Sequence, residues 1–288
     1  MLTKKQKLDY LFSSMVNIAQ DVRCTYCGST DCITIDRKYF VTRLMECLQC
    51  HLYFRHPVDR QDENDKYYQT EYKESDHVTT DLPTMDLLEK LKKENFNSVS
   101  KNAGRFLDLF KRLFPLESSL KIVDYGCSWG YLTYQFQEAG HQTQGFEISR
   151  SRADFGNKNL GLQIVTDEKS LRGGNDIFFS SHVIEHHPDI KAMLKLAKSL
   201  VLPGGYFIAF CPNGSPAFRA LHPEAFHRFW GKVHPNFLNA EFFQNIFRDR
   251  PYLIGASSVE RNHIRPLDSG DQIVDPLTGE ELMVIARF

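Results

Sequence analysis

The sequence predicts an α/β protein with a mainly parallel sheet, preceded by a small cysteine-rich module. Two observations support this. From about residue 119 onward, short apolar runs alternate with segments of helical periodicity, the pattern of repeated βαβ units. In front of these units, five of the seven cysteines fall between residues 24 and 50. Hydrophobic residues make up 42% of the chain and charged residues 25%, so a buried core of ordinary size is expected.

Each element of the larger domain is indicated by its own pattern of apolar residues. The expected strands are Lys121–Asp124, Thr143–Glu147, Leu162–Val165, Asp176–Ser180 and Tyr206–Phe210. The expected helices are Tyr131–Ala139, Ser151–Asn159 and Ile190–Val201, with a further helical stretch from Thr84 to Phe114 that Pro115 ends. Two tail segments, Tyr252–Val259 and Glu281–Phe288, predict strands that close the sheet as an antiparallel pair.

Four of the clustered cysteines form two Cys-x-x-Cys pairs, Cys24 with Cys27 and Cys47 with Cys50. Such a pair places two thiolates on one side of a tight turn, and two pairs complete a tetrahedral S4 site for zinc. The β-prone segment between the pairs fits a hairpin that brings them together, and Gly28 suits the left-handed position that such turns require. Disulfides and buried free thiols are the alternatives. We expect a structural zinc, with Cys32 and His51 as surplus neighbours.

Charge and hydropathy narrow the classes of function. The formal net charge is -1, and residues 21–60 hold six Lys or Arg against five Asp or Glu, so nothing in the charge suggests nucleic-acid binding. The sequence has no apolar run of about 18 residues that could span a membrane. The interrupted segment Leu8–Ala19 predicts a short amphipathic helix and not a signal peptide. We therefore expect a cytoplasmic protein.

A glycine-containing turn follows the first strand, in the run Ile122 to Tyr131. Gly126 and Gly130 allow a close backbone approach, and the helix start beyond them offers free N–H groups. The pattern is D-x-G-x-x-x-G, with Asp124 before the first glycine, and not the G-x-G-x-x-G that seats a pyrophosphate. Glu147 ends the next strand, where a carboxylate can accept two ribose hydroxyls. The two acids together favour a cationic nucleoside over a dinucleotide, and therefore argue against a dehydrogenase.

On these residues, 121–212 resemble the class I S-adenosylmethionine-dependent methyltransferases, including Leu202-Pro203-Gly204-Gly205 before the fifth strand. The resemblance implies a Rossmann-like sheet of seven strands with an antiparallel last strand. Cys47-Leu-Gln-Cys50, Tyr53-Phe54 and the tyrosines Tyr67, Tyr68 and Tyr72 resemble the type 23-like subgroup in which a zinc ribbon and a tyrosine-rich arm precede the methyltransferase domain, and whose members often modify sugars or other small metabolites. Ser128-Trp129 departs from the small or glycine residues of many relatives.

The resemblance implies a cofactor site for S-adenosylmethionine. Asp124 and the loop backbone would hold its amino-acid end, Glu147 the ribose, Ile148 one face of the adenine and Asp167 the adenine amino group. The full set of residues expected at this site is Asp124, Tyr125, Gly126, Cys127, Gly130, Tyr131, Glu147, Ile148, Thr166, Asp167 and Ser181.

The fourth strand leads into Ser181-His182-Val183-Ile184-Glu185-His186, and three readings of this segment stay open. If it is helical, His182, Glu185 and His186 share one face at i, i+3 and i+4. A histidine can then act as a general base on a substrate hydroxyl, or the three side chains can bind a divalent cation. The segment resembles the E-x-x-E-H of ubiquinone-biosynthesis O-methyltransferases, with His182 in place of the first acid. In the third reading, Glu185 and His186 only cap and orient the next helix.

The aromatic-rich segment 211–250 is expected to form a cap over the substrate, although packing against the sheet is the ordinary role of its phenylalanines. His234 in this segment resembles a histidine that relatives carry at the mouth of the site, and it is a second candidate base. The chain is thus divided into residues 1–60 (helix and ribbon), 61–118 (arm and linker) and 119–288 (methyltransferase domain with its cap).

The expected function is methyl transfer to a small molecule, most simply O-methylation of a sugar, nucleotide sugar or related metabolite. An rRNA or tRNA methyltransferase with a zinc ribbon is the alternative, and a non-enzymatic binding module the third. The expected partner is a small-molecule acceptor, without nucleic acid or membrane.

Overall fold

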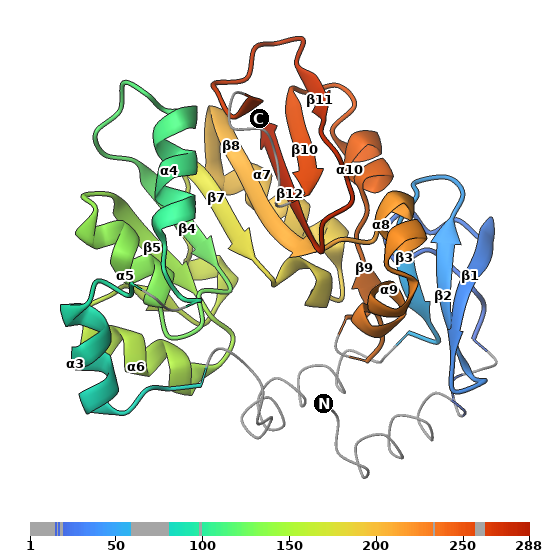
Figure 1. Cartoon of the computed structure of the whole chain (residues 1–288), viewed down its shortest axis with the longest axis horizontal. Helices are drawn as coiled ribbons and strands as arrows, with labels where there is room; N and C mark the ends of the chain where they lie inside the picture. Colours follow the sequence, from blue (N-terminus) through green and yellow to red (C-terminus); the bar gives the residue numbers. More distant parts are fainter. Residues whose placement is uncertain are drawn as a thin grey trace.

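The computed structural model describes residues 15, 17, 20–58, 81–97, 100–232, 234–256 and 263–288 of the chain. Nearly all of the predicted helix Leu8–Ala19, the three tyrosines of the arm and residues 257–259 of the predicted tail strand lie outside these residues. Within them the chain forms two sheets, a large one that carries the predicted methyltransferase fold and a small one at the ribbon (Figure 1). No helix among these residues has the length and apolarity that crossing a bilayer requires.

The large sheet confirms the predicted fold class. Its strands are β4 (Lys121–Tyr125), β5 (Gln142–Phe146), β6 (Ile164–Val165), β7 (Asn175–Ser181), β8 (Val201–Pro212), β10 (Tyr252–Ala256), β11 (Gln272–Val274) and β12 (Glu281–Arg287). They lie in the order β11-β10-β12-β8-β7-β4-β5-β6. Of these, β12 alone runs antiparallel to its neighbours, β8 and β10. The short strand β11, which pairs in parallel with β10, makes the sheet one strand wider than predicted.

Successive side chains along each strand point to opposite faces of this sheet, and on both faces they are buried in a core. On β7, Phe178 faces one core while Ile177 and Phe179 face the other. The first core is covered by α7 (Ile190–Leu200) and α10 (Ala240–Ile246), and the second by α4 (Gly104–Leu113) and α5 (Tyr131–Glu138). A third cluster joins α3 (Met85–Lys93) and α6 (Arg150–Leu160) around Trp129. The result is a three-layer α/β/α arrangement.

The predicted hairpin between the cysteine pairs is present as β1 (Cys32–Lys38) and β2 (Thr42–Cys47). A third strand, β3 (Tyr53–His56), pairs antiparallel with β2 on one side and with β9 (Asn236–Phe237) on the other. The strand β9 belongs to the segment 211–250, so this four-stranded sheet joins the ribbon to the cap. Figure 1 shows β1–β3 beside β9 and the cap helices α8 (Pro216–Leu221) and α9 (Pro223–Phe229).

A shared apolar cluster fills the space between the ribbon and the cap. Leu44 and Tyr53 of the ribbon pack with four cap aromatics, which are Phe218, Phe226, Trp230 and Phe237. Polar contacts surround the cluster: Asp36 accepts hydrogen bonds from Trp230 Nε1 at 2.8 Å and pairs with His227 Nδ1 at 2.7 Å. These cap aromatics are therefore packing residues, which is the ordinary reading of the aromatic-rich segment.

Phe179 offers a direct test of the second core. Its ring is fully buried and lies 4.9, 5.8 and 5.4 Å from the rings of Phe106, Phe110 and Phe136. We expect Phe179→Ala to lower the free energy of unfolding by about 3–5 kcal/mol, because it would leave a cavity between three rings that are held on the helices α4 and α5. Phe40→Ala is the matched control, since Phe40 is 99% exposed. Denaturant unfolding measures both, and an equal loss in the two variants would contradict the assignment of the core.

Candidate functional site

The two cysteine pairs form equivalent turns. Gly28 N–H donates to Cys24 O at 2.9 Å, and His51 N–H donates to Cys47 O at 2.8 Å. Gly28 and His51 both have left-handed φ angles, of 77° and 61°. The glycine that the sequence singled out thus has a counterpart in His51, whose backbone and not its ring completes the second turn.

The four thiols lie together as the spacing predicted. Cys24 Sγ is 3.5 Å from Cys50 Sγ, Cys27 Sγ is 3.5 Å from Cys47 Sγ, and all four sulfurs fall within 4.8 Å of one another. Tetrahedral zinc with Zn–S bonds of about 2.3 Å separates its sulfurs by roughly 3.8 Å. The donor set therefore fits a structural zinc.

The turn after β4 is held in an unusual backbone path. Gly126, Ser128 and Gly130 all adopt left-handed φ angles, of 82°, 54° and 81°. A Cβ atom on Gly126 would lie 2.2 Å from Val183 Cγ2, and one on Gly130 would lie 2.3 Å from Leu162 Cδ1. Both glycines are thus required by the protein's own packing, a reason that the sequence argument, which considered only a ligand, did not contain. Ser128 adopts the same left-handed region without being glycine.

Asp124 and Glu147 end neighbouring parallel strands and meet around this turn. Asp124 is 2% exposed, and its Oδ2 accepts a hydrogen bond from Thr133 at 2.6 Å. Glu147 is 6% exposed and accepts from the backbone N–H groups of Ser128, at 2.9 Å, and Ser149, at 2.8 Å. Glu147 therefore fixes the turn as well as ending its strand.

Burial sets the protonation of both acids. It raises the pKa of Asp124 to about 7, opposed by the Thr133 hydrogen bond and reinforced by the charge of Glu147. Burial also raises the pKa of Glu147, against its two backbone donors and Arg152. A nearby cation would relieve the cost of two buried carboxylates, which makes this edge of the sheet suited to a positively charged ligand.

The other residues expected at the cofactor site divide by exposure. Ile148, Thr166 and Asp167 are exposed at the ends of β5 and β6, and Ser181 is half-buried at the end of β7. Asp167 also caps a short 3₁₀ turn by accepting from Lys169 N–H at 3.0 Å.

Tyr125, Cys127 and Tyr131 are engaged in packing. Tyr125 stacks on Phe146 at 4.9 Å, and its hydroxyl hydrogen-bonds to Glu168. Cys127 is buried beside Gly145, and Tyr131 lies 5.3 Å from the ring of Trp129. The side chains of Tyr125 and Cys127 are committed to the protein, so a ligand would meet these two residues at the backbone.

The histidine segment after β7 does not form the single helical face that the sequence argument required. Only Ile184–His186 are helical, as one 3₁₀ turn, and His182 precedes it with a left-handed φ of 55°. The His182 ring points to β12, where its Nε2 lies 2.9 Å from Glu281 Oε1, while its Nδ1 is 3.7 Å from Glu185 Oε1. The helical condition for a shared i, i+3, i+4 face is therefore not met, although Glu185 Oε1 lies 3.7 Å from both His182 Nδ1 and His186 Nε2.

Arg105 of α4 completes an ion-pair chain with His182. Its guanidinium donates to both oxygens of Glu281, at 2.5 and 2.9 Å. Burial disfavours charge here, but the carboxylates of Glu185 and Glu281 outweigh it and raise the pKa of His182 to about 10. Likewise His182 and Arg105 overcome burial and lower the pKa of Glu281 to about 2. The raised pKa favours the protonated ring of His182, whose two nitrogens face the carboxylates of Glu281 and Glu185.

The sequence argument missed Glu281 and Arg105. A topological signal for Glu281 was present, because the first residue of an antiparallel closing strand lies beside the last residues of the parallel ones. Glu281 indeed pairs in register with Pro212 at the end of β8. Arg105 carries no comparable signal.

His234 joins His182 and His186 in the cluster around Glu185. The rings of His186 and His234 are 4.7 Å apart, and His186 Nε2 is 3.7 Å from Glu185 Oε1. Glu185 is 1% exposed, and neither of its carboxylate oxygens has a hydrogen-bond donor among the described residues. Ligand atoms of Glu185, His186 and His234 lie within 4.8 Å of one another. The triad that the sequence proposed for a cation, His182 with Glu185 and His186, is thus regrouped around His234.

His234 has a defined tautomer. Its Nδ1 donates to the carbonyl of Phe229, which leaves Nε2 as the acceptor nitrogen of a neutral ring. Burial and the proximity of His186 lower the pKa of His234 to about 4. Burial would raise the pKa of Glu185, but His182 and His186 hold it below its usual value. The cluster therefore combines a buried carboxylate, a fixed cation and a neutral imidazole.

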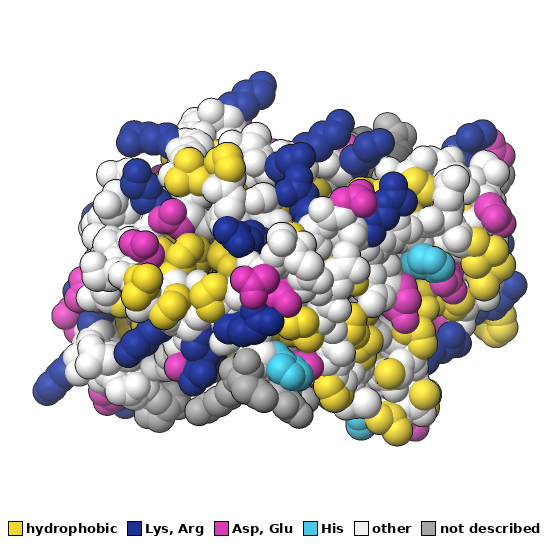
Figure 2. All heavy atoms as spheres, turned by 90° about the horizontal axis from the view of Figure 1, so that it is seen from above, with side chains coloured by type: hydrophobic (Ala, Val, Ile, Leu, Met, Phe, Trp, Pro, Cys, Tyr) yellow, Lys and Arg dark blue, Asp and Glu magenta, His cyan; other side chains and the backbone are white. Residues whose placement is uncertain are grey.

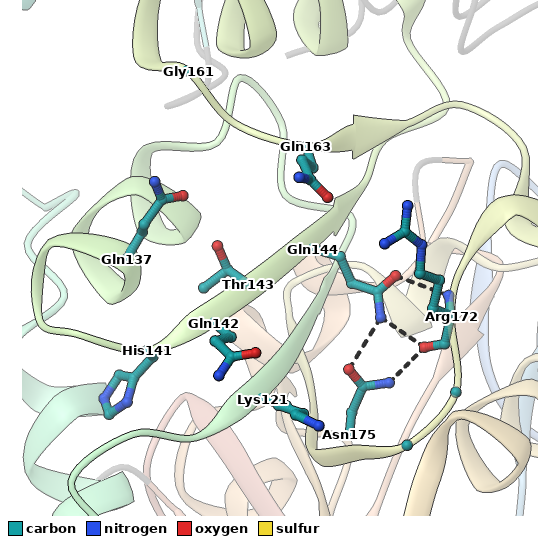
Figure 3. A pocket seen from close by; sticks show the side chains of 12 residues that line it. Lys121, Gln137, His141, Gln142, Thr143, Gln144, Gly161, Gln163, Arg172 and Asn175 are labelled. Carbon is teal, nitrogen blue, oxygen red and sulfur yellow. Dashed lines mark hydrogen bonds between the residues drawn. The ribbon is translucent and has the colours of Figure 1, made fainter.

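A cavity of about 590 Å³ lies away from all of these groups. Figure 3 shows its lining at the amino ends of β4 and β5, where Gln144 ties Arg172 to Asn175 through hydrogen bonds of 2.7 to 3.0 Å. Asp124 and Glu147 are at the opposite, carboxyl ends of the same strands. In open α/β sheets ligands bind at the carboxyl ends, so we place the candidate site there and not in this cavity.

Comparison with known proteins identifies the family of the larger domain. Residues 98–252, more than half of the chain, match a family described as "Methyltransferase domain". The chain is 27% identical over 110 residues to a ubiquinone biosynthesis O-methyltransferase of Ralstonia nicotianae, a match to 35% of this chain and 46% of that protein. It is 29% identical over 104 residues to a protein of the same name from Bradyrhizobium, matching 33% of this chain and 41% of the relative. These matches span less than half the length of each curated relative.

Among solved structures, the plantazolicin methyltransferase BpumL in complex with SAH superposes with a TM-score of 0.51 and 14% identity. The match covers 78% of this chain and 95% of BpumL. At this identity the likeness shows the fold alone.

The raised pKa of Asp124 predicts a pH-dependent effect on stability. An unfolded aspartate titrates near 4, so the folded protein loses stability as the pH rises from about 4 to about 7, on the order of 1.4 kcal/mol per unit of pKa difference. Asp124→Asn removes this loss while keeping an acceptor for Thr133. We expect its stability relative to the parent to increase between pH 5 and pH 8, measured by urea unfolding. Asp154→Asn, at an exposed acid of α6, is the control and should show a constant difference. A constant difference for Asp124→Asn as well would refute the raised pKa.

Proposed function

The chain belongs to the methyltransferase-domain family that matches residues 98–252, and from this membership we propose that it is an S-adenosylmethionine-dependent methyltransferase acting on a hydroxyl of a small molecule. The pair of buried carboxylates at the carboxyl ends of β4 and β5 carries the proposal. Asp124 and Glu147 give this edge a negative potential beside a backbone turn with left-handed residues. That arrangement suits a ligand with an ammonium, a sulfonium and a ribose but no phosphate.

The roles of the cofactor residues follow from their exposure. Asp124 and the turn backbone would hold the amino-acid end, and Glu147 the ribose hydroxyls. Ile148 and Asp167, exposed after β5 and β6, would contact the adenine. The structural relative BpumL holds SAH, the demethylated product of this cofactor, on the same fold.

The cluster after β7 supplies the acid–base chemistry. S-adenosylmethionine provides an activated methyl group, which an acceptor oxygen takes in an in-line displacement as the S–CH₃ bond breaks. The acceptor's proton would pass to Nε2 of His234, which is the unprotonated nitrogen of that ring because Nδ1 donates to Phe229. Glu185, buried and ionised beside it, would stabilise the imidazolium that forms. The raised pKa of His182 favours its protonated ring, whose two nitrogens face Glu281 and Glu185, so His182 would orient these carboxylates and His234 is the proposed base.

Polar groups around the cluster favour a hydroxylated acceptor. Two carboxylates, three histidines and Arg105 face one another where the methyl group would be delivered. A sugar, a nucleotide sugar or a related polar metabolite fits these groups better than an apolar molecule. The two curated relatives are named for O-methylation, which agrees with transfer to oxygen.

The ribbon is proposed to be structural, with zinc on Cys24, Cys27, Cys47 and Cys50. One edge of its sheet pairs with the cap, and its apolar side chains pack there, so much of its surface is used within the chain. Figure 2 shows Lys and Arg interspersed with Asp and Glu on the face it displays. An RNA methyltransferase is the alternative, and an RNA affinity that falls steeply with salt would favour it.

Binding and turnover test the proposal separately. We expect calorimetry to detect S-adenosylmethionine binding by the parent and none by Asp124→Ala. With a nucleotide sugar, a free sugar and a catechol as acceptor probes, we expect His234→Ala to lower turnover by about 10²- to 10⁴-fold while cofactor affinity stays within a few-fold, because only proton transfer is lost. His182→Ala should also lower turnover. His222→Ala, at an exposed histidine of the same cap, is the control. Undiminished turnover in both His182→Ala and His234→Ala would exclude the acid–base role.

A divalent cation on Glu185, His186 and His234 is the competing mechanism. The observation that favours it is that the buried oxygens of Glu185 have no hydrogen-bond donor among the described residues. Metal removal distinguishes the two. We expect dialysis against EDTA to leave one zinc per chain, held by the tetrathiolate site, and turnover unchanged on adding Mg²⁺ or Mn²⁺. Cys47→Ser should lower both the zinc content and the melting temperature. Loss of turnover on dialysis, restored by Mg²⁺ or Mn²⁺ with zinc content constant, would replace the base by a metal.

A further inference from the structure

We infer that Asn236 is a positioning residue that ties the first cysteine turn of the ribbon to both histidine-bearing segments, so that the ribbon sets the geometry of the acid–base cluster. The inference deepens the proposed function, and only the expected effect on turnover rests on that function. The packing it describes is independent of that function.

Asn236 lies where three parts of the chain meet. It is 2% exposed, and its backbone pairs with Phe54 in the β3–β9 ladder. Its Nδ2 donates to His187 O at 2.8 Å and lies 3.5 Å from Glu185 O. Its Oδ1 accepts from the hydroxyl of Thr25, at 3.5 Å, and Thr25 stands between the first two zinc-ligand candidates. One amide thus contacts the ribbon and the turn that follows β7.

These contacts fix both members of the histidine pair. His186 immediately precedes His187, whose carbonyl accepts the Asn236 amide. His234 lies two residues before Asn236, in the segment that leads into β9. The carbonyl of the intervening Pro235 accepts a hydrogen bond from the N–H of Arg55, in β3, at 2.7 Å. We therefore attribute the 4.7 Å separation of the His186 and His234 rings to the contacts of Asn236 and to the pairing of β3 with β9.

An asparagine is suited to this position by its chemistry. It presents a donor to two backbone carbonyls and an acceptor to a hydroxyl at once. An aspartate has the same shape but would place a carboxylate oxygen against the carbonyls of Glu185 and His187. The substitution Asn236→Asp therefore changes the contact while conserving side-chain volume.

Asn239 provides a matched control three residues away. It is also fully buried, and its Nδ2 donates to a ribbon carbonyl, that of His51, at 2.8 Å. Its Oδ1 caps α10 by accepting from Phe242 N–H at 2.7 Å, a role that an aspartate can also fill. Asn239→Asp therefore disturbs the joint between cap and ribbon, and among the described residues Asn239 has no side-chain hydrogen bond to the turn after β7.

The experiment compares Asn236→Asp, Asn236→Ala and Asn239→Asp in the full-length, zinc-loaded protein. The primary readout is the set of histidine ring resonances in NMR spectra, assigned by His186→Gln and His234→Gln. We expect both Asn236 variants to shift the His186 and His234 signals and Asn239→Asp to leave them in place while lowering the melting temperature. With an acceptor from the screen above, kcat should fall about 10- to 100-fold for the Asn236 variants, with the dissociation constant of S-adenosylmethionine within two-fold.

Unshifted histidine signals in both Asn236 variants, or equal shifts in Asn239→Asp, would overturn the inference. Should Asn236→Asp fail to fold, Asn236→Ala gives the same readout without a buried charge. If the Asn236 variants show these shifts but the parent protein transfers no methyl group, the positioning role stands and the proposed function is rejected, so the two failures are distinguishable.

Discussion

The pairing of β3 with β9 is the contact on which the arrangement of the site depends. The large sheet can place groups only at the ends of its own strands, and after β7 these are His182 and the turn that holds Glu185 and His186. His234 belongs to the long connection between β8 and β10, which has no place in that sheet. Its path is fixed because β9 adds to the edge of the ribbon sheet, with the cap aromatics packed on Leu44 and Tyr53 beneath it. The ribbon, which precedes the larger domain in the sequence, thereby fixes the segment that carries His234.

The buried charges of the site are balanced locally and not by solvent. Isolated, each buried carboxylate would be costly, and removing one partner of such a pair leaves the other unpaired. Glu281 is matched by Arg105 and His182, and Glu185 by His182 and the adjacent imidazoles. At the edge proposed for the cofactor no cation offsets Asp124 among the described residues that determine its pKa: Thr133 donates hydrogen bonds to it, and Glu147 repels it. The site is thus electrostatically satisfied where acid–base chemistry is proposed and unsatisfied where a cationic ligand is proposed.

Much of this could be predicted from the sequence because it depends on local pattern. The strands of the parallel core are present within a few residues of their predicted bounds, and the cysteine spacing predicted both the hairpin and the gathered thiols. The strand β8 begins five residues early, at Val201, because Val201 already pairs with Asn175, and an irregularity in the ladder follows before Tyr206 pairs with Ile177. The short strand β11 has too few residues to carry a pattern.

What could not be predicted depends on contacts between distant segments. The shared histidine face was predicted for a helix. His182 instead has a left-handed φ angle, and its ring lies against Glu281 of β12. The partnership of His186 with His234, and the role of Asn236, require that a strand of two residues in the cap pair with the ribbon. No periodicity in residues 211–250 records that pairing, since β9 is too short for alternation to show.

The antiparallel strand β12 explains why the site can draw on the tail of the chain. Parallel strands of the sheet all end at the ligand edge, so each contributes residues only after its last position. An antiparallel strand begins at that edge, and its first residue is held in place by pairing with the neighbouring strand. Glu281 occupies this place, opposite Pro212, with its carboxylate between Arg105 and His182. Because that carboxylate is anchored in the sheet and not on a loop, it can hold His182 in one orientation and one protonation state. The reversed strand thus supplies a rigid counter-charge that the loops after the parallel strands do not.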